Sequence, residues 1–150
     1  MDNKSHLLDE LRLEVGLVRE QVHTLSSFYI GVTRKLASRM TNRCSVSIYE
    51  ATEKAFKMKV CVGPCYLKNT ISFGEEILST VAIRGELVFL IDDQMQKVFL
   101  PFYRQHHLLG ILSFHIPKDA YEVTEDDLVF IREIGRFIEV QHETFDSNPF

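Results

Sequence analysis

The sequence has few cysteines, no long apolar run and no apolar leader. Three cysteines is a low and odd number, which is more typical of a reducing cytoplasm than of secretion. No apolar run approaches the roughly 20 residues that a membrane-spanning helix needs. The N-terminal stretch MDNKSHLLDELRLE carries acidic residues and no apolar segment, so we expect no signal peptide. We therefore expect a cytoplasmic protein that does not act at a membrane.

Common enzyme motifs and an excess of basic charge are also absent. The sequence contains no glycine-rich phosphate loop, no HExxH and no GxSxG. Its net charge of -4 implies no polyanionic partner, so we expect no nucleic acid. A basic cluster, Arg34, Lys35, Arg39 and Arg43, lies near the end of a predicted helix. We interpret these residues as cations at the negative end of the helix dipole, with a nucleic-acid patch as the alternative.

The composition is that of one ordinary globular domain. The chain has 150 residues, of which 45% are hydrophobic and 25% are charged, enough to bury a real core. It begins with Met and ends in a polar DSNPF tail, so we expect a complete, small, stand-alone protein. We divide it into an N-terminal dimerisation segment at 1–25, a domain at 26–146 and a tail at 147–150.

Residues 5–41 contain no proline and are predicted to form one long helix. Its apolar residues follow one another at alternating spacings of three and four, which is the heptad pattern of a coiled coil. Valines at one core position and leucines at the other are compatible with two strands. We therefore predict a parallel homodimer, joined by Leu8, Leu11, Val15, Val18, Val22 and Leu25. The alternative is a helix that packs on its own domain.

The remaining chain alternates strands with two capped helices. Ser72 and Glu75 form a capping box for a short helix that Gly85 ends, and Thr124 with Asp127 caps the last helix. Strands are predicted from apolar alternation or apolar runs at 44–51, 56–62, 87–91, 98–103 and 108–116. The fold class is therefore α+β: an antiparallel sheet of about five to six strands, with long N- and C-terminal helices on one face.

Three stretches within residues 26–143 resemble the GAF domain family. SFGEEILSTVAIRGELVFLID resembles the family's capped short helix, turn glycine and strand ending in Ile-Asp. LPFYRQHHLLGILSFHI resembles its proline-bearing strand and the Gly-hydrophobic-Leu strand that follows. YEVTEDDLVFIREIGRFI resembles its closing helix. The resemblance implies a non-catalytic sensory module that homodimerises, signals to a partner protein in trans and holds a small molecule between the sheet and its covering loops.

The stretch 92–96 is too short to form the helix that usually roofs the ligand in this family. We therefore expect no cofactor, and in particular no bilin, haem or cyclic nucleotide. Close packing favours a filled core over a pocket. If a small ligand binds, we predict a site framed by six apolar residues: Phe73, Ile77, Phe89, Phe99, Phe102 and Phe114.

A thiol-based function is the alternative. Cys61 and Cys65 form a CxxxC that matches no standard redox or zinc motif. Free methionine sulfoxide reductases belong to the same family, but matching their helix-opening segment to SFGEEILST places their cysteine on Leu78. We therefore predict no catalytic residues and no metal site, and keep a small redox enzyme or thiol sensor as the second function. His115, inside an apolar strand, is interpreted as a core histidine with its hydrogen bonds satisfied.

Overall fold

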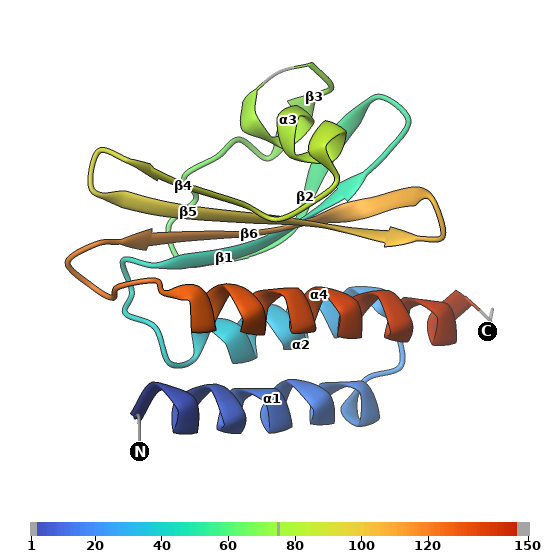
Figure 1. Ribbon diagram of the computed structural model, residues 1–150. Coiled ribbons are helices and arrows are strands. Elements are labelled where there is room, and N and C mark those ends of the chain that lie inside the picture. The colour runs from blue at the N-terminus through green and yellow to red at the C-terminus, as the bar shows by residue number, and fades with distance from the viewer. Residues whose placement is uncertain (1–2, 75, 147–150) are drawn as a thin grey trace.

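The fold is a six-stranded antiparallel sheet with three helices on one face and one short helix on the other (Figure 1). The computed structural model describes residues 3–74 and 76–146. The sheet order is β3-β2-β1-β6-β5-β4. The strands are β1 (Ser45–Ala51), β2 (Ala55–Val62), β3 (Thr70–Ser72), β4 (Val88–Asp92), β5 (Met95–Arg104) and β6 (His107–Pro117). The helices are α1 (Asn3–Gln21), α2 (Leu25–Ala37), α3 (Glu76–Arg84) and α4 (Glu125–Asp146).

This arrangement confirms the predicted fold class. α2 and α4 pack against the sheet, and α1 lies beneath them as an outer layer (Figure 1). We call the face that carries these helices the helix side and the face that carries α3 the outer face. β3 is the one strand that the sequence did not indicate. None of the described helices is both long and apolar enough to cross a membrane.

The sheet is buried on both faces because its central strands alternate between two apolar cores. Along β5, Leu100 and Phe102 point into the helix-side core, whereas Phe99 points into the outer-face core. Successive side chains of a strand point to opposite faces, so each central strand supplies both cores. On the outer face, α3 packs through Leu78 and Val81, which are fully buried. Gly85, with a φ of +69°, ends α3 as the sequence predicts.

The prediction of one long helix at 5–41 is wrong. α1 ends at Gln21, the chain reverses, and α2 begins at Leu25. Thr24 caps α2, since its Oγ1 accepts a hydrogen bond from the Ser27 backbone N–H at 3.1 Å. A Thr in the extended conformation stabilises a new helix start. The region predicted to be one long helix therefore forms two antiparallel helices.

The apolar residues assigned to a dimer interface belong to the chain's own core. The heptad spacing allows α1 to pack on α2 and α4 of the same chain. A helix that packs on its own domain was the alternative that the sequence left open. Gly31 allows the close approach, because a β-carbon there would lie 2.6 Å from Val18 Cγ1. Buried there are Leu8, Leu11, Val15 and Val18, with Val22 and Leu25 partly buried against them.

The helix α1, which falls within the proposed dimerisation segment 1–25, packs into the same core as the rest of the chain. From Asn3 onward, α1 is part of the domain that was assigned to 26–146. The predicted tail at 147–150 lies outside the described residues. The homodimer itself stays a prediction, and it requires a different interface.

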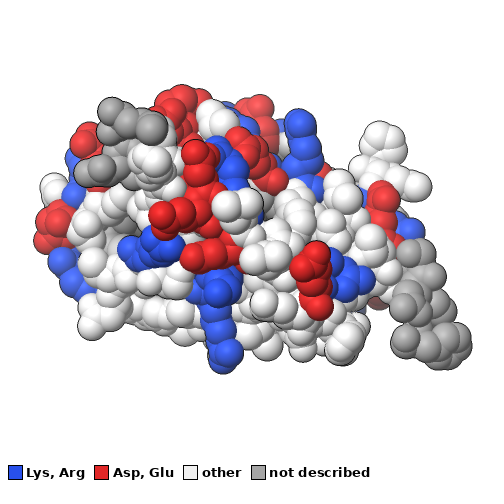
Figure 2. Space-filling view, turned by 90° about the horizontal axis from the view of Figure 1, so that it is seen from below, with Lys and Arg blue, Asp and Glu red and all other residues white. Residues whose placement is uncertain are grey.

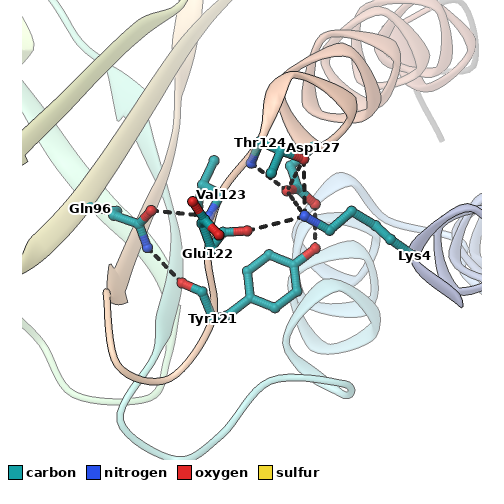
Figure 3. A network of polar contacts seen from close by, with 7 residues as sticks. All are labelled: Lys4, Gln96, Tyr121, Glu122, Val123, Thr124 and Asp127. Atoms are coloured by element: carbon teal, nitrogen blue, oxygen red, sulfur yellow. Dashed lines mark hydrogen bonds and ion pairs between the residues drawn. The ribbon is translucent and has the colours of Figure 1, made fainter. Parts of the chain in front are cut away.

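A polar network fixes the start of α4 (Figure 3). The Thr124 N–H donates to Asp127 Oδ2 at 2.8 Å, as the predicted capping box requires. Lys4 Nζ, from the first turn of α1, reaches the same Asp127 oxygen at 2.9 Å. The buried Gln96 side chain accepts from Val123 N–H at 3.0 Å and donates to the Tyr121 carbonyl at 2.7 Å. The loop between β6 and α4 is thus tied both to the start of β5 and to α1.

The position of α1 gives a testable consequence. Val15 is 1% exposed and Leu13, on the same helix, is 72% exposed. We expect Val15→Asp to lower the free energy of unfolding by more than about 3 kcal/mol, because it buries a charge in the core. The matched change Leu13→Asp should shift it by less than about 0.5 kcal/mol.

Urea denaturation followed by circular dichroism measures both changes. If Val15→Asp keeps wild-type stability and only changes the mass measured by light scattering, the residue lies in an intermolecular interface and α1 does not pack as described.

Candidate functional site

The six residues predicted to frame a pocket do not lie together. Phe102 and Phe114 are buried in the helix-side core, and Phe89 packs against it. Phe99 and Ile77 belong to the outer-face core. Phe73 is 45% exposed and packs against Phe56. The reason is strand alternation: Phe99 and Phe102 are three residues apart, so their side chains point to opposite faces.

A different group of side chains gathers on the outer face, beyond the part that α3 covers. The strand pairing places Ser45, His115 and Lys97 in one row across β1, β6 and β5. The neighbouring row is Cys61, Ser47 and Ser113, on β2, β1 and β6. Directly opposed residues of antiparallel strands share a face, so these six residues form one polar patch. We call them the polar rows.

Four of the six residues in the polar rows are buried although they are polar. Ser45, Ser47, Ser113 and His115 are all less than 5% exposed. Ser113 Oγ and His115 Nε2 have no hydrogen-bond partner among the described residues. Most buried polar atoms have a partner, and leaving one unpaired costs about 1–3 kcal/mol. His115 is a core residue, as predicted, but its hydrogen bonding is not satisfied.

The Tyr66 ring covers one face of His115, and the Phe99 ring contacts the imidazole edge-on at a centroid distance of 5.9 Å. The Tyr66 ring stacks on the imidazole with a centroid distance of 5.2 Å and an interplanar angle of 23°. Tyr66 belongs to the connection between β2 and β3, and its hydroxyl donates to the Arg43 carbonyl at 2.8 Å. Tyr66 is 43% exposed. Movement of the Tyr66 side chain, whose hydroxyl is anchored on the Arg43 carbonyl, would therefore uncover one face of the imidazole.

The electrostatics of the rows keep His115 neutral. Burial, aided by the charge of Lys97, lowers the pKa of His115 to about 4. The Lys97 ammonium lies 3.3 Å from Asp92 Oδ2 at the edge of the rows. At neutral pH the site therefore combines an uncharged imidazole, three serine hydroxyls and a lysine. These groups suit hydrogen bonding to a small anionic molecule.

The two candidate redox residues lie next to each other at the end of β2. Burial, together with a hydrogen bond to the Cys65 side chain, raises the pKa of Cys61 to about 12. Cys65 is exposed, and both thiols are free. The thiolate is the reactive form of cysteine, so Cys61 is a poor nucleophile at neutral pH. Leu78, the position to which the sequence resemblance assigned a reductase cysteine, is fully buried in α3.

No metal-binding cluster accompanies these residues. In the described ranges 3–74 and 76–146, no three His, Cys, Asp or Glu side chains could hold an ion together. His106 lies in the turn between β5 and β6 and His107 is the first residue of β6; both are exposed, on a part of the sheet remote from Cys61.

Comparison with known proteins places the fold. No family model and no curated protein sequence matches the chain. Among solved structures, a GAF domain from an Acinetobacter phosphoenolpyruvate-protein phosphotransferase is 17% identical, with a TM-score of 0.76 and coverage of 99% of each chain. A putative GAF sensor protein from Burkholderia vietnamiensis is 16% identical, with a TM-score of 0.75 and coverage of 95% of this chain and 91% of that one. This chain has a GAF-like fold.

An enzyme shares this GAF-like fold. The free methionine-R-sulfoxide reductase from Neisseria meningitidis, solved with its substrate, is 14% identical, with a TM-score of 0.83. It is covered over 95% of its length and covers 98% of this chain. Sensor domains and reductases both appear among the similar structures, and identities this low establish the fold alone. The function has to be argued from the site.

The lowered pKa of His115 predicts an acid-sensitive stability. The folded chain holds His115 neutral down to about pH 4, whereas the unfolded chain protonates it near 6.5. The contribution of His115 to the free energy of unfolding is therefore fully present above pH 6.5. It falls by roughly 2–3 kcal/mol as the pH is lowered toward 4.

Urea denaturation of His115→Leu across pH 4–7 checks this result. The variant should lose that part of the pH dependence, and the matched change His106→Leu in the exposed turn should keep it. An unchanged pH profile in His115→Leu would contradict the assignment.

Proposed function

We propose that the chain is a non-catalytic GAF-type sensory module that binds a small anionic molecule at the polar rows and signals to a partner protein. The observation that carries the proposal is a pair of buried atoms without a partner among the described residues, Ser113 Oγ and His115 Nε2, of which the second belongs to the imidazole on which the Tyr66 ring stacks. A hydroxyl and an imidazole nitrogen on one face, two residues apart on β6, offer hydrogen bonds that no described protein atom takes up.

The chemistry around these atoms favours a small carboxylate. Lys97 places a positive charge in the same cross-strand row as His115. The serine hydroxyls can donate hydrogen bonds to carboxylate oxygens. The β4–β5 connection is a two-residue turn, Asp93–Gln94, so no roofing helix covers the site. Since Tyr66 is the side chain stacked over His115, the space that its movement frees suits a small molecule.

The position of the site also supports a signalling role. His115 lies between Phe114 and Ile116, which are buried in the helix-side core. A ligand that shifts β6 would therefore act directly on the packing of the helix layer. The terminal helices of that layer are the surface through which we propose that the module contacts its partner.

Reduction of free methionine sulfoxide is the second candidate. The similarity to the Neisseria reductase and the contact between the Cys61 and Cys65 side chains favour it. Three features weigh against it: the raised pKa of the Cys61 thiol, the leucine at position 78 and the short β4–β5 turn. We therefore place it below the sensory function.

The ligand proposal is tested by native mass spectrometry of freshly purified protein, followed by calorimetric titration with acetate, succinate and free amino acids. We expect one carboxylate to bind with 1:1 stoichiometry. His115→Leu and Ser113→Ala should weaken binding by at least about tenfold, because each removes one charge-assisted hydrogen bond.

The matched control for this titration is His106→Leu, in the exposed turn. It should bind as the wild type does. If no carboxylate binds, or if binding persists unchanged in both site variants, the polar rows are not the ligand site.

The catalytic alternative is tested separately. We expect purified protein supplied with a dithiol reductant to show no turnover of free methionine sulfoxide above the uncatalysed rate. The reason is that a thiol with a pKa of about 12 supplies almost no thiolate at neutral pH. Turnover that is lost in the Cys61→Ser, Cys65→Ser double variant would establish the reductase function instead.

A further inference from the structure

A second feature lies on the opposite face of the sheet from the polar rows. The helix side contains a cavity of about 100 Å³ between α1, α2, α4 and the end of β6. Its walls are mainly apolar, and they include Leu8, Leu11, Leu36, Phe114, Phe130 and Ile131. We call this space the helix-side cavity. Natural interiors leave few voids larger than a water molecule, so an apolar space of this size is a candidate site.

The charged groups in the cavity wall are already paired. Asp127 binds Lys4 Nζ at 2.9 Å and accepts from the Tyr121 hydroxyl. Arg39 pairs with Glu10 at 2.9 Å and with Glu14 at 2.8 Å. Figure 2 shows such neighbouring opposite charges on the helix-side surface. Figure 3 shows the contacts of Asp127 with Lys4 and Tyr121. A charged ligand would have to break one of these pairs, whereas an uncharged one would leave them intact.

We propose that the helix-side cavity binds a small uncharged apolar molecule, an aromatic ring or a short alkyl chain of about the size of benzene. Apolar cavities of comparable size stay dry and take up benzene or xenon, because the occupant restores the dispersion contacts that the lining atoms lack. Polar groups contribute little to this wall, so water has few partners in it.

An occupant would fix α1 against the rest of the domain. It would touch α1 through Leu8 and Leu11, α2 through Leu36 and α4 through Phe130 and Ile131 at the same time. Lys4 is the polar link between the first turn of α1 and the start of α4. The site is separate from the proposed carboxylate site, which lies on the other face.

The test uses benzene and xenon as probes and methyl NMR of the full chain as the readout. We expect saturable shifts of the Leu8, Leu11 and Ile131 methyl groups and a rise in the melting temperature with benzene concentration. Ala120, which lines the cavity, provides the filling variant. Ala120→Leu should weaken benzene binding by at least about tenfold, since the added atoms occupy the ligand's space.

The controls separate this site from surface adsorption and from misfolding. Ala82→Leu, the same substitution on α3, should bind benzene as the wild type does. If Ala120→Leu fails to fold, Cys44→Met fills the cavity from another wall. Benzoate should not shift the methyl groups, because the wall offers it no unpaired charge.

Three results would overturn the proposal. The first is that benzene and xenon leave the buried methyl groups unshifted. The second is that shifts occur only at the exposed Leu13 and Leu17. The third is that benzoate binds as tightly as benzene. Carboxylate binding at the polar rows is measured separately, so failure of either proposal is distinguishable from failure of the other.

Discussion

Alternate side chains of β6 point into two different environments, and the positions of the other elements follow from this. Leu112, Phe114 and Ile116 point into the helix-side core. Ile111 points into the outer-face core beneath α3. Ser113 and His115 point to the same face of the sheet, beyond the part that α3 covers. Antiparallel sheets commonly leave one face in water. Because β6 is apolar toward the helix side and buried toward the outer face as well, both faces of the sheet require a cover.

The two faces of the sheet are covered to different extents. Three helices cover the helix side, whereas α3 is nine residues long and covers only part of the outer face. The remaining part is covered by a loop and the ring of Tyr66, so polar side chains are buried there without a complete set of partners. The helix side is closed more fully but retains a cavity. Each unpaired polar atom costs about 1–3 kcal/mol. The unpaired polar atoms and the helix-side cavity lie on opposite faces of the sheet.

The sequence was sufficient to predict the element types and the fold class, because caps and periodicity are local signals. Thr124, Asp127 and Gly85 mark helix ends wherever the helix packs. It was insufficient for α1 and α2, since a spacing of three and four describes a helix that packs on a neighbour within the chain as well as on another chain. The signals for the reversal were the capping residue Thr24 and the small residue Gly31, which are both compatible with a continuous helix until the packing is known.

The site was harder to predict because it depends on register across strands. The phenylalanines were predicted to line a pocket because they are large and apolar. Phe99 and Phe102 are three residues apart on β5, however, so their side chains point to opposite faces of the sheet. The signal that could have found the polar rows was the alternation in LSFHI, where Ser113 and His115 point away from three apolar residues. That these atoms lack partners follows only from the pairing with β1 and β5 and from the burial beneath Tyr66.

The two candidate sites share one strand, which constrains how they would act together. Phe114 lines the helix-side cavity, and the next residue, His115, lies in the polar rows. A change of β6 position or twist moves both residues at once, since they are joined by one peptide unit. A ligand shifts such a strand only by its difference in affinity for the two positions. Linkage then requires that each ligand change the affinity of the other by the same factor. The two sites are therefore coupled only if β6 can adopt two positions. If β6 packs in the same way with and without a ligand, the sites are independent.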